Sequence, residues 1–322
     1  MKQSKTVMAC IDLSEYSPMT LAYAAGLAKG GKLVVCSVVH QRDVQPVYIA
    51  ELASPFQVDT EEQTAYLLAE RKKEVNALVA KTVGKRDVRV HIDTGHPADK
   101  ILMAVESLAP DLVVMANKGR SNLSRFMFGS AAERVFRNCQ APLLSVRDKA
   151  IFRRRRPGGG AQPSAQPIQT IMAAVDFSYW TDDVLAQTAW LARVTGAKVK
   201  VFNCINQEEV DWVETHFTPA ERFSRSRFVA DEKSKRKRHL MEKLQASALG
   251  KVTPAEIVMD FGVPFKRILK AVDDLGADVL VMGPRGRSRT DRFRFGSTVE
   301  KVFRHCPVPV LRLGPEFNSV KE

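Results

Sequence analysis

The sequence predicts an α/β protein of two tandem domains, each an open five-stranded parallel sheet with helices on both faces. Three observations lead to this prediction. The chain has 322 residues, a length that suits about two domains. Its second half repeats the pattern of its first. Within each half, short apolar runs alternate with helical segments, the order typical of a parallel sheet.

The repeat is clearest towards the end of each half. Residues 112–147 read LVVMANKGRSNLSRFMFGSAAERVFRNCQAPLLSVR, and residues 279–314 read VLVMGPRGRSRTDRFRFGSTVEKVFRHCPVPVLRLG. The two segments align without a gap, so Gly119 corresponds to Gly286. We therefore interpret the chain as two copies of one domain.

The beginnings of the two halves also match. MACIDLSEYS at 8–17 corresponds to MAAVDFSYWT at 172–181, which pairs Asp12 with Asp176. Each aspartate follows a short apolar run, so each is predicted to end the first strand of its copy.

A segment of different composition separates the copies. RRRRPGGGAQPSAQP at 153–167 is rich in Gly, Pro, Ser and Gln and has no apolar period, which is typical of a flexible linker. We predict a first domain at 1–148, a linker at 149–167 and a second domain at 168–315.

The elements of the first copy follow from their patterns. Short apolar or alternating runs predict strands, and longer segments with helical spacing, bounded by Gly or Pro, predict helices. In chain order we predict a strand at 6–13, an Ala- and Leu-rich helix at 17–31, a strand at 32–39, a long charged helix at 59–83, an alternating strand at 87–93, a helix opened by Pro97 at 97–109, a strand at 111–116, a helix at 130–139 and a strand at 142–147.

The second copy shows the same order of patterns. We predict strands at 170–177, 198–205, 255–261, 278–283 and 309–313, and helices at 181–196, 219–249, 264–276 and 297–306.

A glycine-rich loop follows the fourth predicted strand of the second copy. Its spacing is Gly283, two residues, Gly286, nine residues, Gly296 and then Ser297, where a helix is predicted to begin. Amides at a helix N-terminus have no intrahelical partner, and the helix dipole adds positive potential, so this geometry suits a phosphate. The glycines let a phosphate approach the backbone without meeting a Cβ. We expect the Ser297 hydroxyl either to cap the helix or to contact a phosphate or its metal ion.

The aspartates and the glycine loops are predicted to share one crevice. Ligands of open α/β sheets bind beyond the carboxyl ends of the strands, where the strand order reverses. Asp12 and Asp176 therefore lie beside the loops only if the first and fourth strands are neighbours. In that arrangement Asp176 can accept hydrogen bonds from ribose hydroxyls. Because the pattern occurs in both copies, the sequence favours a nucleotide site over ordinary turns and caps.

Other chemistry has little support in the sequence. There is no G-x-x-x-x-G-K-[ST] P-loop and no G-x-G-x-x-G after the first strand. The histidines form no H-x-x-x-H pair and the cysteines no C-x-x-C, which argues against a zinc site and a disulfide framework. We therefore predict no catalytic residue, no resident metal and, at most, slow hydrolysis of a bound nucleotide. These histidines and cysteines are His40, His91, His96, His216, His239, His305, Cys10, Cys36, Cys139, Cys204 and Cys306.

Charge and hydropathy limit the class of partner. The net charge of +13 favours anionic partners such as nucleotides, nucleic acid or acidic lipid headgroups. No apolar run approaches the ~18 residues that a membrane span needs, and the N-terminal segment does not resemble a secretory signal. We expect a cytoplasmic protein with no membrane contact.

These features together resemble the universal stress protein family. The resemblance rests on the aspartate after the first strand, the G-2x-G-9x-G-[ST] spacing, the helix that follows and a final Pro-Val-Leu strand. It covers both halves, nearly the whole chain outside the linker. It implies a Rossmann-like fold of the adenine nucleotide alpha-hydrolase type, ATP with or without Mg²⁺ as the ligand, and a regulatory role in the stress response.

The resemblance also implies roles for individual residues. In the second copy it places Asp176 near the ribose and Cys204 near adenine, with the phosphates surrounded by Gly283, Gly286, Arg287, Gly296, Ser297 and Thr298. In the first copy the corresponding residues are Asp12, Val38, Gly119, Gly129 and Ser130. Family members usually dimerise through their fifth strands, so the two copies are expected to pack as an internal pseudo-dimer, with a higher homo-oligomer as an alternative.

Two positions depart from the family pattern. Ala116 stands where the first glycine of the first copy belongs, which is unfavourable if that position needs a positive φ or a close phosphate. Pro284 follows the first glycine of the second copy and cannot donate an amide, so Arg285 or Arg287 would have to compensate if the loop uses that amide. We expect the second copy to hold the better site.

Two alternatives to a regulatory ATP-binding protein stay open. One is a weak ATPase or phosphotransferase. The other is a nucleotide-independent scaffold or nucleic-acid-binding protein that uses the basic run DEKSKRKRH at 231–239 and Arg153–Arg156. The aromatic residues near these runs, Phe152, Phe223 and Phe228, form no obvious platform for stacking bases.

Overall fold

The computed structural model describes residues 5–40, 60–118, 129–148, 164–216, 223–286 and 296–315. The chain divides into two compact units: an N-terminal unit, built mainly from residues 2–147, and a C-terminal unit, built mainly from 166–322. The linker residues 149–163, Gly119 and Arg287 lie outside the described residues.

The described strands of the N-terminal unit form a parallel sheet in the order β3-β2-β1-β4-β5. All five predicted strands are present. Their bounds are β1 Thr6–Cys10, β2 Lys32–His40, β3 Val88–Gly95, β4 Leu112–Ala116 and β5 Leu143–Val146.

The C-terminal unit repeats this sheet in the order β8-β7-β6-β9-β10, again with every pair parallel. Its strands also match the predicted ones. They are β6 Thr170–Ala174, β7 Lys198–Asn206, β8 Ala255–Gly262, β9 Val279–Met282 and β10 Val310–Arg312. The prediction of two tandem α/β units is therefore confirmed, whereas their packing as an internal pseudo-dimer stays a prediction.

The predicted helices are present as well. They are α1 Ser17–Leu27, α3 Thr60–Val83, α4 Pro97–Leu108 and α5 Ser130–Asn138 in the first unit, and α7 Thr181–Thr195, α9 Arg225–Ala246, α10 Pro264–Asp274 and α11 Ser297–His305 in the second. The structure adds α8, Gln207–His216, which the sequence reading missed. None of the helices in the described residues is long and apolar enough to cross a membrane.

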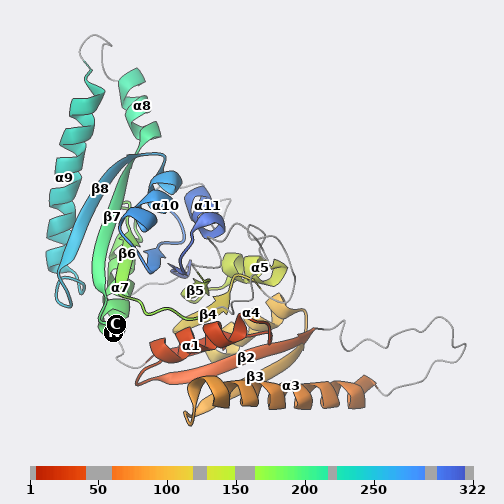
Figure 1. Ribbon diagram of the computed structural model, residues 1–322. Helices are drawn as coiled ribbons and strands as arrows, with labels where there is room; N and C mark the ends of the chain where they lie inside the picture. The colour runs from red at the N-terminus through yellow and green to blue at the C-terminus, as the bar shows by residue number, and fades with distance from the viewer. Residues whose placement is uncertain are drawn as a thin grey trace, which may run out of the picture. The chain divides into compact units, whose positions relative to one another are not determined.

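Helices cover both faces of each sheet, which explains why the central strands are apolar throughout. Every residue of β9 is buried, and in β1 only Thr6 is not. In the C-terminal unit, α9 lies along the outer strand β8, and α10 and α11 lie together on the other side of the sheet (Figure 1).

The strand order confirms the condition on which the predicted crevice depends. In the N-terminal unit β1 pairs with both β2 and β4, and Cys10 lies opposite Met115. In the C-terminal unit β6 pairs with both β7 and β9, and Ala174 lies opposite Met282. The first and fourth strands are thus neighbours in both units, and their carboxyl ends open at the switch point of the sheet.

Candidate functional site

A cavity of about 260 Å³ lies at the switch point of the N-terminal unit and one of about 610 Å³ at that of the C-terminal unit. The larger cavity, which we call the C-terminal crevice, brings together the described residues that the sequence pointed to in the second copy. They are Asp176, Cys204, Gly283, Gly286, Gly296, Ser297 and Thr298.

Asp176 is held in place by a tight turn just after β6. The strand pairing ends at Ala174, so the aspartate lies two residues beyond the strand that it was predicted to end. The Ser178 N–H donates to Asp176 Oδ1 over 3.0 Å. The next residue, Phe177, has a φ of 58°, a left-handed conformation that costs a non-glycine residue about 1 kcal/mol or more.

The N-terminal unit repeats this turn. Ser14 N–H donates to Asp12 Oδ1 over 3.0 Å, and Leu13 has a φ of 60°. The hydroxyl of Ser17 also donates to Asp12 Oδ1, over 3.3 Å. A strained conformation at the same place in both copies shows that the turn is a property of the repeat and orients each carboxylate over the crevice.

Gly283 and Gly286 of the loop are needed for space rather than for backbone conformation, whereas an added Cβ at Gly296 would meet its nearest atoms at 3.5 Å, an ordinary contact. A Cβ added to Gly286 would lie 2.7 Å from Asp176 Oδ2, and one added to Gly283 would lie 2.9 Å from the Cβ of Trp180. Neither glycine has a positive φ, so that explanation for the first glycine of the motif is wrong. At Gly286 the loop backbone passes directly against the carboxylate of Asp176.

Gly296 joins the end of the loop to its beginning. Its N–H donates to the carbonyl of Pro284 over 3.2 Å, and Gly129 makes the equivalent bond to Asn117 over 3.3 Å. Pro284 therefore takes part in closing the loop through its carbonyl group, for which no N–H is needed.

Helix α11 begins directly at the crevice. Its N-cap is Gly296, no side chain caps it, and Ser297 is its first residue. Of the two roles expected for Ser297, capping is therefore wrong, and contact with a phosphate or its metal ion stays a prediction. The amides of the first turn, from Ser297 to Val299, have no carbonyl partner within the helix. They and the helix dipole make this end of the crevice attractive to an anion.

The other end of the crevice lies where β7 runs into α8. Cys204, Asn206, Glu208 and Glu209 line it. Burial, followed by the nearby Asp260 carboxylate, raises the pKa of Cys204 to about 12. The Cys204 thiol therefore stays protonated and is a poor nucleophile.

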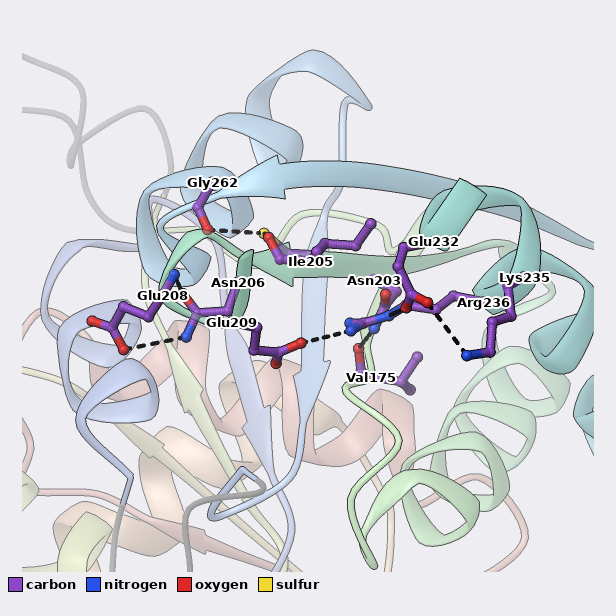
Figure 2. Close-up of polar contacts among 11 residues, drawn as sticks. Val175, Asn203, Ile205, Asn206, Glu208, Glu209, Glu232, Lys235, Arg236 and Gly262 are labelled. Atoms are coloured by element: carbon purple, nitrogen blue, oxygen red, sulfur yellow. Dashed lines mark hydrogen bonds and ion pairs between the residues drawn. The ribbon is translucent and has the colours of Figure 1, made fainter. Parts of the chain in front are cut away.

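A partly buried ion-pair cluster supports this wall. Arg236 of α9 bonds to Glu209 over 2.6 Å and to Glu232 over 3.1 Å, and Figure 2 shows its guanidinium between the two carboxylates, beside Asn203. Burial tends to raise the pKa of Glu232, but hydrogen bonds from Arg236 and Lys235 lower it overall. Burial also tends to lower the pKa of Arg236, but the hydrogen bond to Glu209 raises it overall.

Asn203, on β7 next to Cys204, is fully buried. Its Nδ2 donates to the carbonyl of Val175 over 2.8 Å, which ties β7 to the segment that carries Asp176. Sequence reasoning missed Asn203 and the inward orientation of Arg236. The available signal for Asn203 was its position as a polar residue within a buried strand. Nothing in the basic run of α9 distinguished Arg236 from its exposed neighbours.

The N-terminal cavity contains Asp12, Val38, Gly129 and Ser130, as predicted for the first copy, and also Ala116. The buried Arg71 of α3 lines it and donates to the Ser37 hydroxyl over 3.5 Å. His40 and His96, whose ring centroids are 6.1 Å apart, also line it, and sequence reasoning did not join these two. Among the described residues, no group of three or more His, Cys, Asp or Glu side chains is placed to hold a metal ion.

The fold and its crevices define a class of protein: doubly wound α/β domains with a binding crevice at the switch point of the sheet. The family model described as the universal stress protein family matches residues 3–147 and 167–313. The chain belongs to this family and carries its domain twice, which confirms the resemblance seen in the sequence.

Relatives by sequence agree with this assignment. A universal stress protein of Methanocaldococcus jannaschii is 33% identical over 111 residues, which are 33% of this chain and 65% of that protein. A Staphylococcus haemolyticus protein whose name also places it among the universal stress proteins is 29% identical over 145 residues, which are 44% of this chain and 82% of that protein. The chain thus spans just under two thirds of the M. jannaschii relative.

Solved structures agree on the fold. A universal stress protein from Archaeoglobus fulgidus matches with a TM-score of 0.65 over 98% of this chain and 100% of its own, at 20% identity. At that identity the similarity concerns the fold alone.

Proposed function

We propose that this universal stress protein binds ATP in its C-terminal crevice and that the nucleotide acts mainly as a regulatory ligand in a stress response. The observation that carries the proposal is the contact between Gly286 and the carboxylate of Asp176, beside the N-terminus of α11. A carboxylate, a backbone without side chains and unpaired helix amides are the groups that a ribose and a phosphate chain require.

The crevice suits a nucleotide in size and in the order of its groups. Its volume of about 610 Å³ lies within the ~300–1,000 Å³ typical of small-molecule sites. In the proposed orientation Asp176 accepts from the ribose hydroxyls. The phosphates lie against Gly283, Gly286 and the first turn of α11, and the base lies near Cys204.

The charged side chains at the phosphate end of the crevice bear on whether ATP binds with or without Mg²⁺. Arg285 lines the phosphate end, but so does Glu300, which bonds to Arg304 over 3.2 Å. Because Asp176 is also close, carboxylates would repel a bare phosphate chain. We therefore expect ATP to bind as its Mg²⁺ complex, with the ion supplied together with the phosphates.

A ligand role is favoured over a covalent catalytic one. Cys204 is the thiol within the crevice, and its pKa of about 12 keeps it protonated. The N-terminal cavity, at about 260 Å³, is less than half as large, so we propose that it binds ATP more weakly than the C-terminal crevice or not at all.

The first test is to denature the purified protein, identify released nucleotides by mass spectrometry, and titrate Mg²⁺ATP into the nucleotide-free chain by calorimetry. We expect about one nucleotide per chain. Asp176→Ala should weaken binding about 10-fold or more, because it removes a charged hydrogen-bond acceptor. Asp12→Ala, the matched change in the other copy, should leave the main binding event intact. No released nucleotide together with no heat of binding would refute the proposal.

A further inference from the structure

Helices α8 and α9 do not form the phosphate end of the crevice, and they carry exposed basic and aromatic side chains. We propose that α9 and the exposed Trp212 of α8 form a binding surface for single-stranded nucleic acid. The proposal is independent of ATP binding. It rests on which cations of the basic run remain available, on the position of Trp212 and on the burial of the apolar face of α9.

The basic run divides into two groups in the structure. Arg236 is turned inward, with 13% of its side chain exposed, and is paired with Glu209 and Glu232. Lys233, Lys237 and Arg238, which we call the basic stripe, make no ion pair with any residue that the structure describes. Lys237 and Arg238 are exposed and Lys233 is partly so. The stripe is therefore available to an external anion.

The arrangement of the stripe is unfavourable for the isolated helix. Lys233 and Lys237 are four residues apart, so their charges lie one turn apart on the same side, where like charges destabilise a helix. The exposed acids Glu242, four residues after Arg238, and Asp231, seven before it, lie beside Arg238, so the repulsion is confined to Lys233 and Lys237. A closely spaced polyanion such as a phosphate backbone relieves this repulsion.

Trp212 supplies the flat surface that the sequence did not reveal near the basic run. Its side chain is 53% exposed, and its ring stacks on His216 with centroids 5.1 Å apart and planes at 24°. Aromatic side chains beside cations are typical of surfaces that bind single strands, because unpaired bases stack on them.

Ion pairs hold α8, which carries Trp212, against α9. Arg225 bonds to Asp211 and Glu214, and Arg236 further along bonds to Glu209, so α8 runs beside α9 as Figure 1 shows. Trp212 stands in the sequence between the two carboxylates that bond Arg225. Lys233 is eight residues beyond Arg225, which at ~1.5 Å per residue is about 12 Å along the axis of α9, a distance that about two nucleotides can bridge.

The burial of α9 argues against a membrane surface as the occupant. A helix that lies in a membrane interface inserts its apolar face. In α9 the apolar side chains Leu240 and Leu244 are 0% and 7% exposed, packed within the unit, and Met241, which is 47% exposed, is a single apolar side chain that does not make an apolar face. A duplex is also a poorer fit than a single strand, because its bases are already stacked on each other.

The test is fluorescence anisotropy of a labelled oligothymidylate titrated with the full chain over a series of salt concentrations. We expect the triple variant Lys233→Gln, Lys237→Gln, Arg238→Gln to bind at least 10-fold more weakly at low salt. The slope of log K against log salt should become smaller in magnitude by about 2, as the loss of three phosphate contacts requires. Trp212→Ala should weaken binding about 5-fold or more.

A matched control removes the same charge elsewhere. Lys29, Lys32 and Lys85 are exposed residues of the N-terminal unit, and changing all three to Gln should leave affinity and salt slope close to those of the wild type. A second readout is intrinsic fluorescence. Trp180 and Trp190 are 9% and 2% exposed, so quenching by the oligonucleotide should come from Trp212 and disappear in Trp212→Ala.

Several outcomes would overturn the inference. These are no binding at low salt, equal binding by the wild type and the triple variant, and binding to phosphatidylserine vesicles in preference to the oligonucleotide. Competition by saturating Mg²⁺ATP would also overturn it, because the strand would then occupy the crevice. Failure of ATP to bind would leave the salt titrations, the variants and the vesicle comparison unaffected, so the two proposals are separable.

Discussion

Gly286 shows how closely the loop backbone approaches the carboxylate of Asp176. The 2.7 Å that would separate an added Cβ from Asp176 Oδ2 is shorter than any ordinary contact, so even a methyl group must displace the carboxylate. The glycine spacing was readable from the sequence. The reason for it was not, because the contact joins residues more than a hundred positions apart.

A substitution at this position should therefore affect binding more than folding. In Gly286→Ala the carboxylate can swing away into the crevice, so we expect little loss of stability but about 10-fold weaker ATP binding or more, the effect of losing a hydrogen bond to a charged group. Calorimetry and a urea denaturation curve measure the two effects. Gly26→Ala is the control, since nothing lies within 4 Å of its added Cβ. Unchanged affinity in Gly286→Ala would contradict the role given to this contact.

The left-handed residues Leu13 and Phe177 mark the limit of sequence reading at this scale. Both are bulky non-glycine residues with φ near 60°, a conformation that their side chains do not favour. The residue types at these positions do not predict this turn. The tertiary structure imposes it on both copies.

At the scale of elements, the strands and long helices were predictable because buried parallel strands and amphipathic helices have clear patterns. Helix α8 was not predictable, because it begins at Gln207, directly after β7 ends at Asn206, and is rich in charge. Missing α8 also concealed Trp212. The inward turn of Arg236 was hidden for a related reason: its partner Glu209 lies on the helix that was missed.

The Arg236 cluster should contribute to stability in a pH-dependent way. Arg236→Met leaves Glu209 and Glu232 without their main partner. Glu232 is 20% exposed and Glu209 41%, so solvent limits the cost to about 1–2 kcal/mol near neutral pH. Because the pKa of Glu232 is lowered in the folded state, this stability is present above the unfolded pKa of about 4.3 and is lost as the pH falls through the folded value.

Urea denaturation of wild type and Arg236→Met at neutral and acidic pH measures this effect. The difference between the two proteins should shrink on acidification. Lys235→Gln is the control: it removes a cation that pairs with the same Glu232 over 3.3 Å but is 74% exposed, so it should cost under about 0.5 kcal/mol. A difference between wild type and Arg236→Met that grows at low pH would contradict this account.

At the scale of the whole molecule, the two copies share a fold but differ in their crevices. The cavities are about 260 and 610 Å³, a difference far larger than a methyl group. Ala116 was the signal of asymmetry in the sequence. The difference in volume depends on many side chains that line the two cavities. It therefore cannot be predicted from any single position of the motif.

Restoring the missing glycine should therefore not create a second strong site. We expect Ala116→Gly to bind about one ATP per chain, like the wild type, because removing one methyl group does not enlarge the N-terminal cavity to the size of the other. Calorimetric stoichiometry measures this, with Asp176→Ala in the same background to show which copy is occupied. Two strong sites in Ala116→Gly would mean that Ala116 alone blocks the first copy.

The position of the crevice between β6 and β9 also determines when it can exist during synthesis. Asp176 emerges from the ribosome early in the C-terminal unit, whereas α11 begins 121 residues later, at Ser297. A nascent chain that has made β6 and β7 holds one side of the crevice and none of its anion-binding end. The nucleotide that we propose for the crevice could thus favour only the finished unit, and by joining its first strand to its last helix it would help to secure a domain that has just completed folding.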